Sequence, residues 1–338
     1  MTLLCRTAEN LYWMGRYVER AEQLTRLVRE HTVLITDLPV SAGLGWDSLL
    51  AIPGETGPFF ERYDRADEAN VMTYLLADQT NPSSLVWSLR WARENLRTTR
   101  STMPRGTWRI LNELTQYATS SAELGCLRGR RYEFCERVVS GCQRLTGFLA
   151  GSMGRDPAWD FYQLGVQLER ADMTSRVLDV RAGGLVTEIE DSGGAFRDTQ
   201  WVSLLRSLDG LQLYRRMTRS LVEGDRVVAF VLGERQFPRS VGACLTSARD
   251  LLAALPDIAG AEHARTATEQ ALRRLDELPA SGWTHQTLHA QADEVQLTLA
   301  AIDRMIGAAY FRLEGGAPAD GTDESATDTV QSQTQISA

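Results

Sequence analysis

The 338-residue sequence predicts an all-α protein, a helical bundle of about 10 helices built from two halves related by a pseudo-twofold axis. Apolar residues recur at helical spacing along most of the chain, and no convincing alternating strand pattern occurs. Two different markers also occur twice, in the same order and at nearly the same separation. Chance explains one such repeat more easily than both. We therefore expect repeat halves at about 1–155 and 156–313.

The first repeated marker is one face of a helix, with the pattern Ala-x3-Tyr-x2-Gly-x3-Glu-x2-acid-x3-Arg. Its two copies are Ala8, Tyr12, Gly15, Glu19, Glu22 and Arg26, and Ala158, Tyr162, Gly165, Glu169, Asp172 and Arg176. At about 100° per residue, all six side chains of a copy lie along one line of the helix. A whole helical face with two acids and an arginine is therefore repeated.

The second marker is an apolar helical segment followed by Pro-x-Ser. Its copies are Val71, Leu75, Leu76, Pro82 and Ser84, and Val227, Val231, Leu232, Pro238 and Ser240. No Gly-x-Ser-x-Gly surrounds either serine, so we interpret both as first-turn residues of helices rather than nucleophiles.

The expected elements follow from the apolar spacing and from breaking residues. The first helix covers 5–36 and ends before Leu38-Pro39. Further helices are expected at 60–79, 83–101, 105–123, 130–151, 157–181, 199–221, 226–234, 238–255, 261–277 and 284–312. The Gly-rich stretch 182–198 is expected to be a loop. Residues 314–338 contain no arginine and almost no large apolar residue. We therefore expect a single helical domain, 1–313, followed by a disordered acidic tail.

Composition narrows the classes of function. All 36 residues of the Lys and Arg types are arginine. Mechanisms that use a lysine Schiff base, a lysine general base or a phosphate-loop lysine are therefore excluded. No Gly-rich phosphate loop is present, and no cofactor is expected. The net charge of −8 opposes nucleic-acid binding. No apolar run is long enough for a membrane span, and five scattered cysteines suit a reducing cytoplasm.

The two glycines of the repeated face point to a possible site. Gly15 and Gly165 lie in mid-helix, where glycine costs about 1 kcal/mol against alanine, so we expect close approach of another backbone there. If the two helices cross at these glycines, Glu19 and Glu169 are drawn inside and need arginine partners. Candidate partners are the Arg26 and Arg176 side chains of the opposite copy.

Two interpretations of this face stay open: ion pairs that only lock two helices in register, and a polar cleft lined by both copies. The candidate cleft residues are Arg6, Glu9, Asn10, Tyr12, Arg16, Glu19, Arg20, Arg26, Tyr162, Glu169, Arg170, Asp172 and Arg176. No metal is expected, because the Glu-x2-His of di-iron bundles is absent. His285 and His289 are interpreted as an exposed polar face rather than a zinc site.

Several segments resemble the bacterial alpha-E domain family, named for its all-helical nature and its Glu-Arg motif. They are Leu4–Glu22, Ala77–Ser84, Ala92–Asn95, Leu164–Arg176 and Phe237–Val241, and the resemblance covers roughly 1–312. It implies a partnership with a circularly permuted ATP-grasp ligase, often with a transglutaminase-like protein nearby, in a system that makes and removes amide linkages.

Three functions remain possible after this resemblance. The first is a non-ATP-binding helical partner of the ligase that binds a peptide or amino-acid substrate or product, or scaffolds the complex. The alternative is an enzyme itself, acting on amide or acyl-phosphate intermediates through Glu19, Glu169 and neighbouring arginines. The third is a homo-oligomeric scaffold, which needs only exposed helix faces.

Overall fold

The computed structural model describes residues 3–37, 44–187 and 194–311, with the side chains of 183–197 left out of the description. The described residues are all-helical and contain no strand. The α-helices are α1 (Cys5–Asp37), α2 (Ser48–Ala51), α3 (Thr56–Phe60), α4 (Glu68–Met72), α5 (Leu85–Thr99), α6 (Gly106–Ser120), α7 (Ala122–Cys126), α8 (Arg128–Ser152), α9 (Pro157–Thr187), α10 (Gly194–Ser207), α11 (Leu211–Thr218), α12 (Gly224–Gly233), α13 (Val241–Ala254), α14 (Ala261–Asp276) and α15 (His285–Ile306). Two π-helical turns, Thr73–Ala77 and Gly307–Phe311, and a 3-10 turn, Arg100–Thr102, complete the set.

The all-α prediction is confirmed, but several boundaries are different. The expected helix 60–79 breaks into α3, α4 and a π-helical turn, and 199–221 breaks into α10 and α11. The second break follows from local geometry, because Asp209 adopts a left-handed conformation (φ 58°). The loop expected at 182–198 is wrong at both of its ends, since α9 continues to Thr187 and α10 begins at Gly194, and its middle part, 188–193, lies outside the described residues. The expected tail, 314–338, lies outside the described residues.

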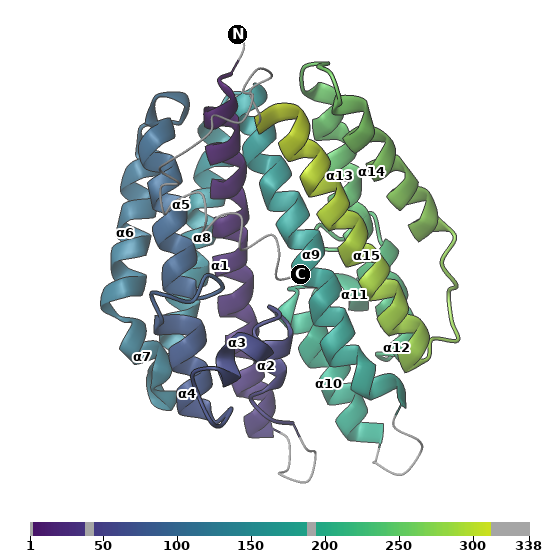
Figure 1. Ribbon diagram of the computed structural model, residues 1–338. Helices are drawn as coiled ribbons and strands as arrows, with labels where there is room; N and C mark the ends of the chain where they lie inside the picture. Colours follow the sequence, from purple (N-terminus) through teal and green to yellow (C-terminus); the bar gives the residue numbers. More distant parts are fainter. Residues whose placement is uncertain (1–2, 38–43, 188–193, 312–338) are drawn as a thin grey trace.

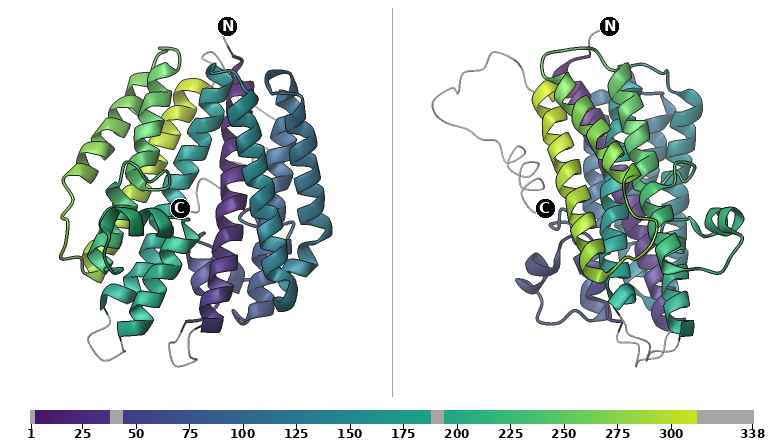
Figure 2. Two further views of the ribbon diagram at one scale, coloured as in Figure 1. Left: turned by 180° about the vertical axis from the view of Figure 1, so that it is seen from behind. Right: turned by 90° about the vertical axis from the view of Figure 1, so that its right-hand side faces the viewer.

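Two long helices, α1 and α9, lie side by side in the middle of the bundle (Figure 1). They run parallel, because Tyr12 lies against Gly165 near their first turns and His31 meets Arg181 near their ends. Helices α5 and α8 contact α1 and are bridged by α6, while α13 and α15 contact α9 and are bridged by α14. Figure 2 shows the same arrangement from behind, with the blue helices and the green helices on opposite sides of the central pair.

Each half therefore contributes four helices to this arrangement in the same chain order, and one buried apolar cluster runs through both. The second marker has the same role in each half. Ser84 accepts a bond from the backbone N–H of Trp87, and Ser240 accepts one from Ala243, so both serines cap the start of a helix. The pseudo-twofold relation between the halves stays a prediction. No helix in the described part of the chain is long and apolar enough to cross a membrane.

The central pair meets at the two repeated glycines, as the cost of mid-helix glycine predicted. A Cβ atom on Gly15 would lie 2.2 Å from the carbonyl oxygen of Tyr162, and one on Gly165 would lie 2.0 Å from that of Tyr12. Both distances are far below van der Waals contact, and both obstacles are backbone. The contact is reciprocal, since each glycine receives the tyrosine carbonyl that lies one turn before the other glycine.

Gly165→Ala should destabilise the protein by about 1–3 kcal/mol or more, because the methyl group forces the central helices apart. Gly147→Ala is the matched control: this glycine also lies inside a long helix, but a Cβ there meets nothing within 4 Å. The control should be neutral or stabilise by up to about 1 kcal/mol. Urea unfolding measures both, and equal effects of the two changes would contradict the close contact.

Candidate functional site

The core of the site is a reciprocal pair of ion pairs between α1 and α9. The Arg170 guanidinium donates to both oxygens of Glu19, from Nε at 3.0 Å and from Nη2 at 2.7 Å. Arg20 donates to both oxygens of Glu169, from Nε at 2.5 Å and from Nη2 at 3.1 Å. Each Glu-Arg dipeptide therefore gives its acid to the arginine of the other dipeptide. This two-point geometry is the strong form of a charge-assisted hydrogen bond.

A second arginine binds each of these acids. Glu19 accepts from Nη1 of Arg239 at 2.6 Å, and Glu169 accepts from Nε of Arg16 at 2.8 Å. Arg16 also donates to Asp303 of α15 at 2.7 Å, and the hydroxyl of Tyr12 donates to the same carboxylate. The central pair is thereby connected to α15 and to the turn that precedes α13.

Burial and charge act in opposite directions on the two glutamates, which are 3% and 1% exposed. Burial alone would raise the pKa of Glu19, but the Arg170 and Arg239 guanidinium groups outweigh it and lower the pKa to about 2. Burial likewise raises the pKa of Glu169, and Arg20 and Arg16 outweigh it and lower that pKa to about 2. Both carboxylates stay ionised at neutral pH.

The expected burial of Glu19 and Glu169 against arginine is confirmed, but the expected partners are wrong. Arg26 bonds Glu22 on its own helix and pairs with Asp209 at 2.9 Å, and Arg176 bonds Asp172 at 2.9 Å. In a parallel pair of helices, residues 19 and 169 lie at the same level, whereas Arg176 lies two turns further along. The arginine next to each glutamate points about 100° away from it. This arginine bonds the glutamate of the other helix.

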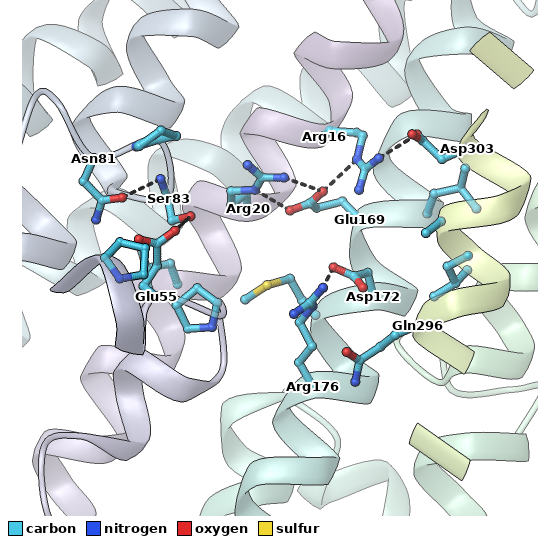
Figure 3. Close-up of a pocket in the computed structure, with 18 of the residues that line it drawn as sticks. Arg16, Arg20, Glu55, Asn81, Ser83, Glu169, Asp172, Arg176, Gln296 and Asp303 are labelled. Carbon is cyan, nitrogen blue, oxygen red and sulfur yellow. Dashed lines mark hydrogen bonds and ion pairs between the residues drawn. The ribbon is translucent and has the colours of Figure 1, made fainter. Parts of the chain in front are cut away.

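A cavity of ≈330 Å³ opens beside Glu169, between α1, α9, α15 and the segments 53–62 and 80–83. In Figure 3, Arg16, Arg20 and Glu169 lie along one side of it, Glu55 and Ser83 form another wall, and Asp172, Arg176 and Gln296 face them. Its size is at the lower end of small-molecule sites. Five of the residues predicted from the sequence line it: Arg16, Arg20, Glu169, Asp172 and Arg176.

The other predicted residues do not line this cavity. Glu19, Arg26 and Arg170 belong to a buried network on the side of Arg239, and Tyr12 and Tyr162 are buried at the glycine contact. Arg6, Glu9 and Asn10 lie near the start of α1, where Arg6 is exposed and Asn10 bonds Thr98 at 2.9 Å. The sequence predicted a single cleft, whereas the structure divides these residues between an open pocket and a closed network of ion pairs.

Sequence reasoning missed several residues of the site. Glu55 accepts from the hydroxyls of Tyr74 and Ser83, both at 2.6 Å, and Asn81 accepts from the backbone N–H of Ser83 at 2.8 Å. Ser83 and Arg239 follow the repeated prolines, so the second marker offered a signal for them. No repeat or motif in the sequence pointed to Glu55, Asp303 or Gln296.

The two histidines of α15 lie on an exposed face, away from this pocket. His289 bonds Asp179 of α9 at 2.8 Å, and this bond raises the pKa of the imidazole. Ligand atoms of Asp179, His289 and Asp293 lie within 4.8 Å of one another, so they could hold a metal ion, whereas His285 stacks on His289 and is outside this group. Acidic groups this exposed are commonly found together without an ion.

Comparison with known proteins gives the family. A family model, Alpha-E, described as a predicted alpha-helical domain with a conserved ER motif, matches residues 3–311. The chain belongs to the Alpha-E family. Uncharacterised proteins of Mycobacterium bovis and Mycobacterium tuberculosis are 26% identical to it over 343 residues, which is 92% of this chain but 37% of each relative. No solved structure matches the chain. The central dipeptides Glu19-Arg20 and Glu169-Arg170 both have the Glu-Arg sequence that the family description names.

Glu19→Gln preserves the shape of the Alpha-E motif but leaves Arg170 and Arg239 buried without their charge partner. We expect a loss of about 3–5 kcal/mol in unfolding free energy. Glu133→Gln is the control, because Glu133 forms an exposed pair with Arg130 that contributes at most about 1 kcal/mol. Urea unfolding compares the two variants, and an unchanged midpoint for Glu19→Gln would contradict the structural role of the motif.

Acid should destabilise this Alpha-E chain through the same two carboxylates. Their folded pKa values of about 2 lie below the ordinary value of 4.5, so their stabilisation is complete above about pH 5 and is lost as the pH falls towards 2. Each group should contribute up to about 3 kcal/mol. Unfolding free energies measured from pH 7 to pH 2.5 should fall steeply below pH 5. They should fall less steeply in Glu19→Gln, and identical slopes would oppose this assignment.

Proposed function

We propose that the chain is a non-ATP-binding helical partner of a circularly permuted ATP-grasp ligase in an amide- or peptide-bond-forming system. In this proposal it binds the peptide or amino-acid substrate or product of the ligase in the pocket beside Glu169. The observation that supports it is the charge pattern of the pocket. The ligase itself is what the family resemblance implies, and a transglutaminase-like protein is a further expected neighbour.

The pocket presents both charges in equal number. Five arginines and five acidic residues line it: Arg16, Arg20, Arg62, Arg176 and Arg304, and Glu55, Glu61, Glu169, Asp172 and Asp303. Apolar side chains, among them Trp13, Leu168 and Met173, lie between the charged groups. Peptides and amino acids carry both an amino and a carboxylate group on an apolar frame, so their chemistry matches this lining.

The ion pairing favours binding over catalysis by the motif glutamates. A general acid or base needs a pKa near the working pH and a free position on the reacting group. Glu169 has a pKa of about 2, and two arginines occupy both of its oxygens. Glu19 is held in the same way and does not line the pocket. An enzyme that uses these two carboxylates is therefore the weaker alternative.

Nucleotide chemistry would come from another polypeptide or domain, since the sequence has no lysine and no phosphate loop. The match covers only 37% of the length of each mycobacterial relative. The remaining length of those relatives leaves room for a fused partner domain, which is in keeping with a helical protein that acts beside an enzyme.

Co-purification with a circularly permuted ATP-grasp protein from the same organism tests the proposal. We expect a stable complex and at least a tenfold increase in ATP-dependent amide formation when this chain is present. Arg176→Leu, which changes the pocket, should keep the complex and lower amide formation, whereas Arg249→Leu on an exposed pair with Asp250 should change neither. A ligase that neither binds this chain nor responds to it would contradict the partnership.

A further inference from the structure

The two copies of the second marker differ at one informative position. The first reads Pro82-Ser83-Ser84 and the second Pro238-Arg239-Ser240. The flanking serines have the same role, since Ser84 donates to the carbonyl of Asp78 and Ser240 to that of Glu234 while each caps a helix. Positions 83 and 239 are therefore equivalent in local structure, but one carries a short side chain and the other an arginine.

Arg239 fills the polar site of its own side. Its guanidinium donates from Nη1 to Glu19 at 2.6 Å and from Nη2 to Glu22 at 2.7 Å, and its side chain is 12% exposed. These two acids are the acidic residues of the repeated face. One arginine side chain thus closes the space against them.

Ser83 leaves the corresponding space empty. Its hydroxyl turns to Glu55 at 2.6 Å, and the cavity of ≈330 Å³ lies where a longer side chain would extend. Glu169 and Asp172, which match Glu19 and Glu22 in the repeat, both line this cavity. The open pocket is thus the counterpart of the site that Arg239 occupies, except that Arg16 of α1 already binds Glu169 there.

Two carboxylates in the pocket keep capacity for a cation. Asp172 accepts from Arg176 through Oδ2 only, and within the described residues its Oδ1 accepts no bond. Glu55 accepts from two hydroxyls, and no arginine or histidine in the described part of the chain pairs with it. An ammonium or guanidinium group placed between these two walls would gain charge-assisted bonds to both.

We propose that the pocket binds a cationic group of the ligand, a guanidinium or ammonium, between Glu55 and Asp172, the residue that matches Glu22 in the repeat. This inference rests on the proposed function in that it names the class of amino compound which the ligase partner would hold. Arginyl or lysyl side chains and free diamines or guanidines carry this chemistry. In the described parts of the chain, the outer nitrogens of Arg176 and the side chain of the exposed Arg304 donate no bond, so both remain for a carboxylate of the same ligand.

Neighbouring arginines do not exclude a cation here. Arg16 and Arg20 are neutralised by Glu169 and Asp303. Arg239 also lies near two arginines, Arg170 and Arg26, and still forms both of its ion pairs. The open pocket has one acid more than that arrangement has, because Glu55 has no counterpart among the partners of Arg239.

Calorimetric titration of the full chain tests this inference. The probes are agmatine, arginine, lysine and the amidated tripeptide Gly-Arg-Gly, with succinate and glutamate as acidic probes. We expect agmatine or the tripeptide to bind at least tenfold more tightly than succinate. The stronger of the two indicates whether the group is presented on a free compound or on a peptide. Asp172→Asn and Glu55→Gln should each weaken binding at least tenfold, while Asp250→Asn on the outer surface should not.

Ser83→Arg is the decisive variant, because it should supply the missing side chain from within the chain. We expect it to abolish cation binding at an unchanged or raised thermal midpoint, whereas Ser83→Ala, which leaves the space open, should keep binding. Binding of succinate without agmatine or tripeptide, or wild-type binding in Ser83→Arg, would overturn the inference. A ligase complex that forms without cation binding refutes only the ligand class, and cation binding without a complex refutes only the partnership.

Discussion

The reciprocal exchange of carboxylates between two Glu-Arg dipeptides is the constraint on which the rest of the structure depends. Four buried charges are tolerated only if every acid meets its arginine, which requires α1 and α9 to be parallel and in one register. The glycines one turn earlier make this possible, because a Cβ on either would collide with a carbonyl oxygen of the other helix. Close backbone contact and charge exchange therefore specify the same arrangement, and the outer helices pack around it.

The repeated face has a different role on each side of the central pair. On one side its charges form a closed structural network, and on the other side they line an open pocket. On one side Arg239 closes the network by binding both Glu19 and Glu22. On the other side a serine stands in the equivalent turn, and a cavity remains. A duplicated element can in this way keep one copy as a structural lock while the other copy stays open to a ligand.

The sequence predicted the features that depend on one helix alone. Spacing along the chain placed Gly15 and Glu19 on one face, and the cost of a mid-helix glycine and of a buried acid implied the crossing and the burial. It did not identify the partners, because which arginine meets Glu19 depends on the relative rotation of two helices. Glu55 and Asp303 reach the pocket from segments outside the repeated markers, so no sequence pattern predicted that they belong to the site. The short helices depend on local turns such as the left-handed Asp209.

An open pocket beside a closed network also has an energetic meaning. Filling the cavity with an arginine from position 83 would bury apolar stem and satisfy Asp172 and Glu55, so the present sequence forgoes that stabilisation. A ligand that supplies the missing cationic group would make these interactions instead, and they would contribute to its binding free energy. Such a ligand would stabilise the folded chain by RT ln(1 + [L]/Kd). Because the carboxylates are already held by Tyr74, Ser83 and Arg176, little reorganisation accompanies binding. In the proposed function, the rigid frame that the Glu-Arg exchange creates would make the pocket selective for charge and geometry.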